Sequence, residues 1–186
     1  METTEKVVYL TFDDGPVPEV TPLVLDLLND FNAKASFFCV GDNARMYPEI
    51  LNRIVENGHC VGNHTQNHLN GWGTSTFSYF RNYLDCSKWV DSRLFRPPYG
   101  RITKKQLSGI KVRSKVIMWD VLSGDFDQKI SVEKCVENVL SNVQPGSIVV
   151  FHDSIKAKSN VLGALPEILK DLKLQGYEFK SLKEIQ

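Results

Sequence analysis

Short apolar runs alternate with longer amphipathic segments along the chain. The short runs are rich in β-branched and aromatic residues, as buried strands are, and they cover residues 7–12, 35–40, 60–63, 94–96, 115–119, 147–151 and 177–180. The longer segments have helical character, and they cover residues 21–31, 48–57, 75–88, 103–108, 131–142 and 161–175. This alternation predicts a parallel sheet covered by helices. No repeat or long linker interrupts it, so we expect a single domain over residues 1–186.

Proline and glycine support several of these boundaries. Pro22 suits the first turn of a helix. Gly58 and Gly176 fit positions just after helix ends, and Pro97 with Pro98 keeps the run before them from continuing as a helix. The pattern alone leaves open whether the sheet is open and doubly wound or closed, or nearly closed, as a barrel.

Composition and charge exclude several classes of function. The 22 Lys and Arg residues balance the 22 Asp and Glu residues, and no basic stripe indicates nucleic-acid binding. No apolar run reaches the ~18 residues of a membrane span, and residues 1–6 lack the apolar core of a signal peptide. We therefore expect a cytoplasmic protein as the sequence stands, or an extracytoplasmic one if a leader has been removed. The pattern favours no oligomeric state.

The chain has four cysteines, and none of them forms a CxxC pair. We expect reduced and mostly buried thiols at Cys39, Cys60, Cys86 and Cys135. Disulfides or a thiolate metal site remain the alternatives.

Polar residues with useful chemistry gather where the predicted strands end. In chain order they are Asp13, Asp14, His64, Arg96, Asp120 and His152. Because the carboxyl ends of parallel strands converge on one face of the fold, we expect these segments to meet in one cleft. His59 lies at the start of its strand, the wrong end for such a cleft, and is interpreted as structural.

A metal site is predicted from one carboxylate and two histidines. His64 and His68 are four residues apart, and on a helical turn both imidazoles would reach one ion. With one carboxylate of the Asp13–Asp14 pair they form a facial set that leaves positions for water and substrate. The alternative is a plain turn at residues 13–16 and a pair of surface or capping histidines.

The remaining strand-end residues suit hydrolysis of an unactivated carbonyl bond. Asp13 would accept a proton from the attacking water, and Arg96 would hold that carboxylate ionised. Tyr99 is the first residue after Pro97 and Pro98 with a backbone N–H that can stabilise an oxyanion. His152 would donate a proton to the leaving amine. A solvated loop histidine and a surface arginine are the alternatives.

Three motifs in this order closely resemble those of the polysaccharide deacetylase family, the fourth carbohydrate esterase family. They are residues 11–16 (TFDDGP), 64–68 (HTQNH) and 96–100 (RPPYG). The family includes chitin, peptidoglycan and acetylxylan deacetylases, and the resemblance runs from Val7 to about Tyr177. It implies an α/β fold of the distorted (β/α)7 barrel type. It also implies a divalent metal, usually Zn²⁺, with Co²⁺ or Ni²⁺ as other candidates.

The resemblance further implies a role for each matching residue. Asp13 matches the catalytic base, His152 the catalytic acid and Arg96 the arginine that tunes the base. Asp14, His64 and His68 match the metal ligands, and Tyr99 matches the backbone donor to the oxyanion.

The fourth and fifth motifs depart from the family pattern. Leu122 stands where the first aspartate of the fourth motif is expected, and Asp120 or Asp125 would have to substitute for it. Phe126 replaces a tryptophan and Val150 replaces a leucine. Both would still line an apolar pocket for the acetyl methyl group.

Together these residues predict a metal-dependent hydrolase that removes acetyl groups from N-acetylated, and possibly O-acetylated, sugars. Its expected partner is an acetylated saccharide. A catalytically weak sugar-binding relative is one alternative, and Leu122 favours it. A metal-dependent hydrolase of a non-sugar amide is another. Of the aromatic residues Trp72, Tyr79, Tyr83 and Trp89, we expect most to pack in the core, although some are candidates for stacking on sugar rings.

Overall fold

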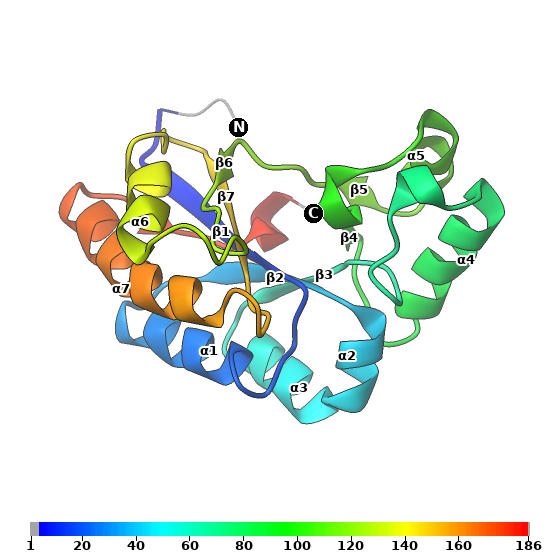
Figure 1. Cartoon of the computed structure of the whole chain (residues 1–186), viewed down its shortest axis with the longest axis horizontal. Helices are drawn as coiled ribbons and strands as arrows, with labels where there is room; N and C mark the ends of the chain where they lie inside the picture. Colours follow the sequence, from blue (N-terminus) through cyan, green and yellow to red (C-terminus); the bar gives the residue numbers. More distant parts are fainter. Residues whose placement is uncertain (1–3, 186) are drawn as a thin grey trace.

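A single parallel sheet organises the chain in the computed structural model, which describes residues 4–185 (Figure 1). Seven strands follow one another in the order β5-β4-β3-β2-β1-β7-β6, and an eighth, β8, pairs with the start of β1. Their bounds are β1 (Val7–Asp13), β2 (Ala35–Cys39), β3 (Cys60–Asn63), β4 (Leu94–Phe95), β5 (Lys115–Val116), β6 (Val121–Leu122), β7 (Ile148–His152) and β8 (Glu178–Phe179). All pairs are parallel, as the alternating pattern predicts.

The sheet curls into a half-barrel with helices on its outer side (Figure 1). The helices are α1 (Thr21–Asp30), α2 (Gly41–Met46), α3 (Pro48–Glu56), α4 (Thr76–Cys86), α5 (Lys104–Lys111), α6 (Val132–Leu140) and α7 (Lys158–Leu174). Short 3-10 turns add η1 (Gly71–Gly73), η2 (Pro98–Gly100) and η3 (Leu182–Ile185). Among residues 4–185 no strand pairing joins β5 to β6, so the barrel stays open there. The expected distorted (β/α)7 barrel is confirmed.

Both faces of the central strand β1 are buried, which explains its unbroken apolar run. Leu10 and Phe12 pack with the helices in the larger core cluster. Val7 and Tyr9 point to the other face and belong to a second cluster inside the curl. Leu182 of η3 is fully buried in that inner cluster, and its N–H donates to Ser36 Oγ at 2.8 Å. The last turn of the chain therefore helps to fill the interior of the half-barrel.

Helix α2 and strand β6 are absent from the sequence prediction, as are the 3-10 turns η1 and η3. Helix α2 begins at Gly41, directly after β2, and its N-terminus has no side-chain cap. Strand β6 has two residues, and we had expected one strand at 115–119 instead. Such brief elements carry too few residues for a periodic signal. No helix within residues 4–185 combines the length and apolar character needed to cross a bilayer.

Candidate metal centre and active site

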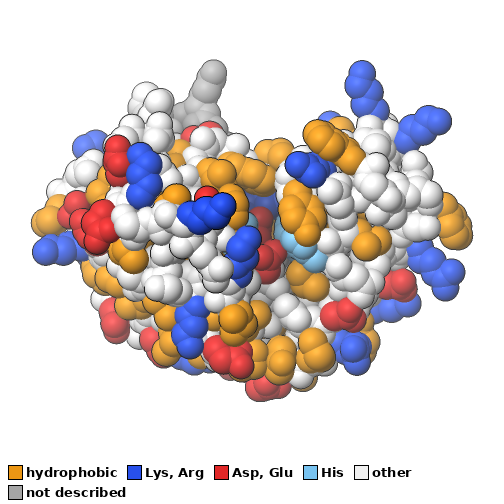
Figure 2. Space-filling model, viewed as in Figure 1, with side chains coloured by type: hydrophobic (Ala, Val, Ile, Leu, Met, Phe, Trp, Pro, Cys, Tyr) orange, Lys and Arg blue, Asp and Glu red, His pale blue; other side chains and the backbone are white. Residues whose placement is uncertain are grey.

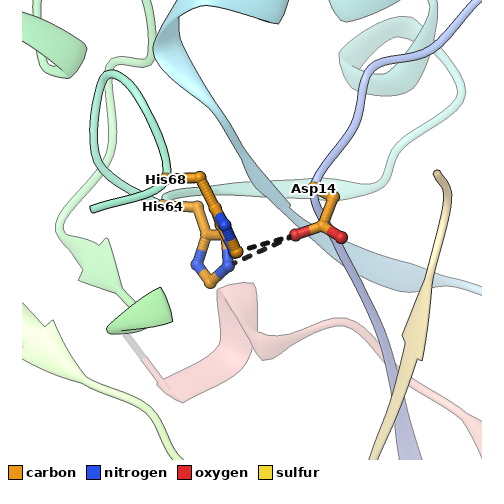
Figure 3. A group of neighbouring side chains, drawn as sticks. All are labelled: Asp14, His64 and His68. Atoms are coloured by element: carbon orange, nitrogen blue, oxygen red, sulfur yellow. Dashed lines mark ion pairs between the residues drawn. The ribbon is translucent and has the colours of Figure 1, made fainter. Parts of the chain in front are cut away.

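Asp14, His64 and His68 converge on one point at the carboxyl ends of β1 and β3 (Figure 3). Asp14 Oδ1 lies 3.1 Å from His68 Nε2 and 3.7 Å from His64 Nε2. Two ligand atoms that share a tetrahedral zinc ion at ~2.0–2.1 Å are roughly 3.3 Å apart. These separations therefore match the spacing of atoms that bind one ion.

The hydrogen bonding of these three side chains also fits a metal. Asp14 Oδ1 is buried and accepts no hydrogen bond from any group in residues 4–185. An unpartnered buried carboxylate oxygen is costly unless a cation compensates it. Its close contacts are the two imidazole nitrogens, which are metal ligands of the same kind as those of catalytic zinc sites. The donor set thus fits a divalent ion with one carboxylate and two imidazoles.

His64 is held in the form that binds metals. Its Nδ1 lies 2.8 Å from the carbonyl oxygen of Arg96, and a proton on Nδ1 makes this contact a hydrogen bond. Burial lowers the pKa of His64 to about 4, against the opposing charges of Asp13 and Asp14. The imidazole is therefore neutral near pH 7, with the lone pair of Nε2 directed toward Asp14.

The segment that carries both histidines is a loop, so the expected helical turn is wrong. Thr65 and His68 have positive φ angles of 65° and 55°, which no right-handed helix contains. Asn63 Oδ1 accepts the Thr65 N–H at 2.9 Å, and Thr65 Oγ1 accepts the Leu69 N–H at 3.0 Å. These side-chain contacts bend the loop, and the bend brings the two rings within 5.0 Å.

Asp13 and Arg96 form a buried ion pair beside the metal ligands. Arg96 Nη1 donates to Asp13 Oδ1 at 2.8 Å and to Thr11 Oγ1 at 2.7 Å. The guanidinium lies over the ring of Phe38 at 4.2 Å and near that of Trp119 at 5.5 Å. The second carboxylate oxygen, Asp13 Oδ2, lies 4.0 Å from Nε2 of the metal ligand His64.

His152 is paired with Asp125, one of the two aspartates expected to substitute at the fourth motif. Its Nδ1 lies 2.8 Å from Asp125 Oδ1, and its backbone N–H donates to Asp125 Oδ2 at 2.7 Å. Burial acts to lower the pKa of His152, but the hydrogen bond and charge of Asp125, helped by Asp13 and Asp14, raise it to about 9. His152 is therefore protonated at neutral pH.

Asp120, the other expected substitute, lies elsewhere. Its carboxylate accepts hydrogen bonds from Ser147 Oγ and from the Ile148 N–H, both at 2.6 Å. These groups are at the start of β7, whereas His152 ends that strand, so the expected tuning role of Asp120 is wrong. Leu122 lies at the wall of the pocket and is 41% exposed.

The site residues share a cleft of about 580 Å³, within the usual range for ligand pockets. Its floor holds the metal ligands together with Asp13 and His152. Phe126 and Val150 line it as expected, and so does Tyr99, whose ring lies 4.6 Å from that of His68. Sequence reasoning missed its remaining lining residues, Arg101, Trp119, Ser154 and Lys156. All four lie within a few residues of a recognised motif, which is the only signal that pointed to them.

The residues assigned to structural roles are outside this cleft. His59 is buried at the start of β3, and its Nδ1 accepts the Ala35 N–H at 3.1 Å. The four cysteines are buried and free, as expected. Tyr79 and Tyr83 are buried in the core, whereas Trp72 and Trp89 are exposed.

Comparisons of sequence agree with this geometry. The model of the polysaccharide deacetylase family matches residues 1–112. A peptidoglycan-N-acetylglucosamine deacetylase of Bacillus cereus is 37% identical, over 97% of this chain and 88% of that protein. The peptidoglycan-N-acetylglucosamine deacetylase PgdA of Listeria monocytogenes is 35% identical over 98% of this chain, but the match spans only 39% of that longer protein.

Solved structures show the same likeness. The crystal structure of a peptidoglycan N-acetylglucosamine deacetylase in complex with 4-naphthalen-1-yl-N-oxidanyl-benzamide superposes with a TM-score of 0.92. Its sequence is 33% identical to this one, and the match covers 97% of this chain and 88% of that chain. The similarity in fold and sequence thus extends over nearly the whole of this chain.

Proposed function

Because this chain belongs to the polysaccharide deacetylase family, it is a sugar deacetylase by class, and we propose that it hydrolyses the acetamide of an N-acetylated saccharide with one divalent metal ion. The observation that carries the proposal is the convergence of Asp14, His64 and His68, with the orphaned Asp14 Oδ1 between two imidazoles. Zinc is the first candidate for the ion, and cobalt or nickel would suit the same donors.

The three ligands hold the ion at the floor of the cleft. When bound there, a divalent ion polarises a carbonyl oxygen and lowers the pKa of a water molecule toward ~7. Tyr99 follows two prolines in the η2 turn, where its φ of 60° sets the direction of its peptide N–H. We assign this N–H to the oxygen that gains negative charge in the transition state.

Asp13 is the proton acceptor in this proposal. Its Oδ1 is engaged by Arg96, and its Oδ2 lies 4.0 Å from His64 Nε2, next to the metal ligands. Arg96 is held in turn by the backbone oxygens of Ile117, at 3.2 Å, and Met118, at 3.4 Å. The carboxylate is thereby fixed in one orientation, which general base catalysis requires.

His152 is the proton donor. Asp125 occupies its Nδ1 and raises its pKa to about 9, so the ring carries a proton on Nε2 at neutral pH. An amine is a poor leaving group unless its nitrogen is protonated as the bond to carbon breaks. Phe126 lies edge-on to the imidazole at 5.2 Å and limits its movement.

Leu122 raised the alternative of a weak sugar-binding relative, and the contacts of the site argue against it. The family resemblance implies that the missing aspartate of the fourth motif would pair with Arg96 or His152, and both of these side chains have other partners here. Arg96 pairs with Asp13, and His152 pairs with Asp125. Leu122 therefore changes the shape of the pocket wall without leaving a buried charge unpaired.

The test is acetate release by the purified chain loaded with zinc. We expect acetate from N-acetylglucosamine oligomers, and a loss of about 10²–10⁴-fold in kcat for Asp13→Asn at unchanged metal content. Metal bound at one equivalent without acetate from any N-acetylated saccharide would contradict the proposed reaction. Absence of metal binding would contradict the proposed centre itself.

A further inference from the structure

Two cations stand at the rim of the cleft, one from each side of the curled sheet. Arg101 follows the η2 turn after β4, and Lys156 lies in the loop between β7 and α7. Three strands separate β4 from β7 in the sheet. Figure 2 shows Lys and Arg side chains on both sides of the hollow that exposes the histidine and acidic side chains of the site.

Each of these cations is supported by an aromatic ring. The guanidinium of Arg101 lies over Trp72 at 5.0 Å, and Lys156 Nζ lies 5.8 Å from the ring of Phe126. The Gly71 N–H donates to the Arg101 carbonyl at 3.2 Å, which ties the turn that carries Trp72 to this side of the cleft. Contacts of this kind reduce the freedom of a long side chain before a ligand arrives.

The charges at the floor do not offset the cations at the rim. The two acidic residues that line the cleft are Asp13 and Asp14. Asp13 is neutralised by Arg96, and Asp14 would be neutralised by a bound divalent ion. The protonated His152 is in turn neutralised by its ion pair with Asp125. A cleft lined by charges of one sign attracts a ligand of the opposite charge and raises the local concentration of that ligand.

We propose that Arg101 and Lys156 select a saccharide that bears a carboxylate beside its N-acetylated sugar. The inference rests on the proposed deacetylase function and adds the class of substrate to it. Arg101 can bind a carboxylate through two parallel N–H donors, and Lys156 supplies a point charge on the opposite rim. A neutral N-acetylglucosamine oligomer gains neither interaction, although it fits the same metal and proton-transfer groups.

The test compares two substrates that differ only in the charge of their lactyl groups. One is a tetrasaccharide of alternating N-acetylglucosamine and N-acetylmuramic acid with free lactyl carboxylates, and the other is the same glycan with these carboxylates converted to methyl amides. We expect the acid form to have a kcat/KM about tenfold higher at low salt, through a lower KM. The ratio should fall toward one at 0.5 M salt, because exposed charges are screened.

Arg101→Gln and Lys156→Gln should each lower the acid-to-amide ratio about threefold, and the double variant should bring it close to one. Lys158→Gln is the matched control, because Lys158 is an exposed lysine in the first turn of α7 that does not line this cleft. A ratio of one in the unaltered protein would overturn the inference, and so would an equal effect of Lys158→Gln. Failure of both glycans to release acetate would instead contradict the proposed deacetylase function.

Discussion

Asp13 and His152 lie side by side at the same level of the sheet, paired in register on the adjacent strands β1 and β7. Residues paired in register on parallel strands direct their side chains to the same face. The proposed proton acceptor and proton donor therefore enter one cleft from neighbouring positions, although they lie near opposite ends of the chain. The ion pair with Arg96 and the contact with Asp125 keep each of them in place.

This arrangement predicts that Asp13 and His152 act on the same reaction. Asp13→Asn and His152→Gln should each reduce kcat by about 10²–10⁴-fold. The double variant should cost little more than the worse single variant, because groups that act as a unit are not additive. Single-turnover acetate release, with the metal content of each protein measured, checks this. Fully multiplicative losses would show that the two residues act independently.

Asp125 should set the alkaline limit of activity. The pKa of His152 is raised to about 9, so the proton donor stays charged up to that pH. Asp125→Asn removes the main influence that raises the pKa of His152, and burial, which lowers that pKa, is then opposed only by the charges of Asp13 and Asp14. We expect the alkaline limb of the kcat/KM profile to move to lower pH. Asp127→Asn, in the same loop, should leave the limb in place, and a limb that stays near pH 9 in Asp125→Asn would contradict this role.

Two buried histidines that flank β3, His59 before it and His64 after it, should differ in their effect on metal binding. His64→Gln removes a proposed ligand, and we expect the zinc affinity to fall by more than about 100-fold. His59→Gln should keep the affinity and lose only the contact with the Ala35 N–H, at a cost of about 1–3 kcal/mol in stability. Competition with a chromogenic chelator and thermal unfolding separate the two effects. Equal zinc affinities would exclude His64 as a ligand.

Long apolar strands made the fold largely predictable from sequence. Strand β1 is buried on both faces, and β7 pairs with it over its full length, so their apolar runs were unbroken. Strand β6 has two residues, and helix α2 has no side-chain cap, so the local sequence contained no periodic pattern or capping residue from which to predict them. The carboxyl ends of β1, β3 and β7 meet on one face of the fold. The positions of Asp14, His64 and His152 at these strand ends were therefore enough to predict that the three residues share one cleft.

Loop conformation accounts for what sequence reasoning missed at the site. The helical turn expected at His64–His68 is replaced by a loop with two positive φ angles. Besides the local side-chain contacts of Asn63 and Thr65, the loop has contacts with residues distant in sequence, such as that of the Gln66 N–H with the Asn82 carbonyl. The choice between Asp120 and Asp125 depends on Gly124, whose φ of 79° turns the chain after β6. That turn lets Asp125 reach His152. The alternation of polar and apolar residues along the strand does not predict the turn.

The loop that carries Asp14 should depend on the absence of a side chain at Gly15. The Gly15 N–H donates to Asp153 Oδ1 at 3.0 Å, and Thr21 Oγ1 donates to Asp153 Oδ2 at 2.6 Å. A Cβ on Gly15 would lie 1.9 Å from Asp153 Oδ2, which is fully buried and has no room to move aside. We expect Gly15→Ala to cost about 2 kcal/mol, or roughly 4–8 °C in Tm, and to weaken zinc binding.

Gly73→Ala provides the control for this glycine, because a Cβ there meets no atom within 4 Å. Its Tm and zinc affinity should match those of the unaltered protein. Asp153→Asn should be tolerated better than Gly15→Ala. Burial already raises the pKa of Asp153 to about 7, so a neutral side chain of the same shape suits the position. If Gly15→Ala and Gly73→Ala had the same Tm and zinc affinity, the contact between Asp153 and the loop would not position Asp14.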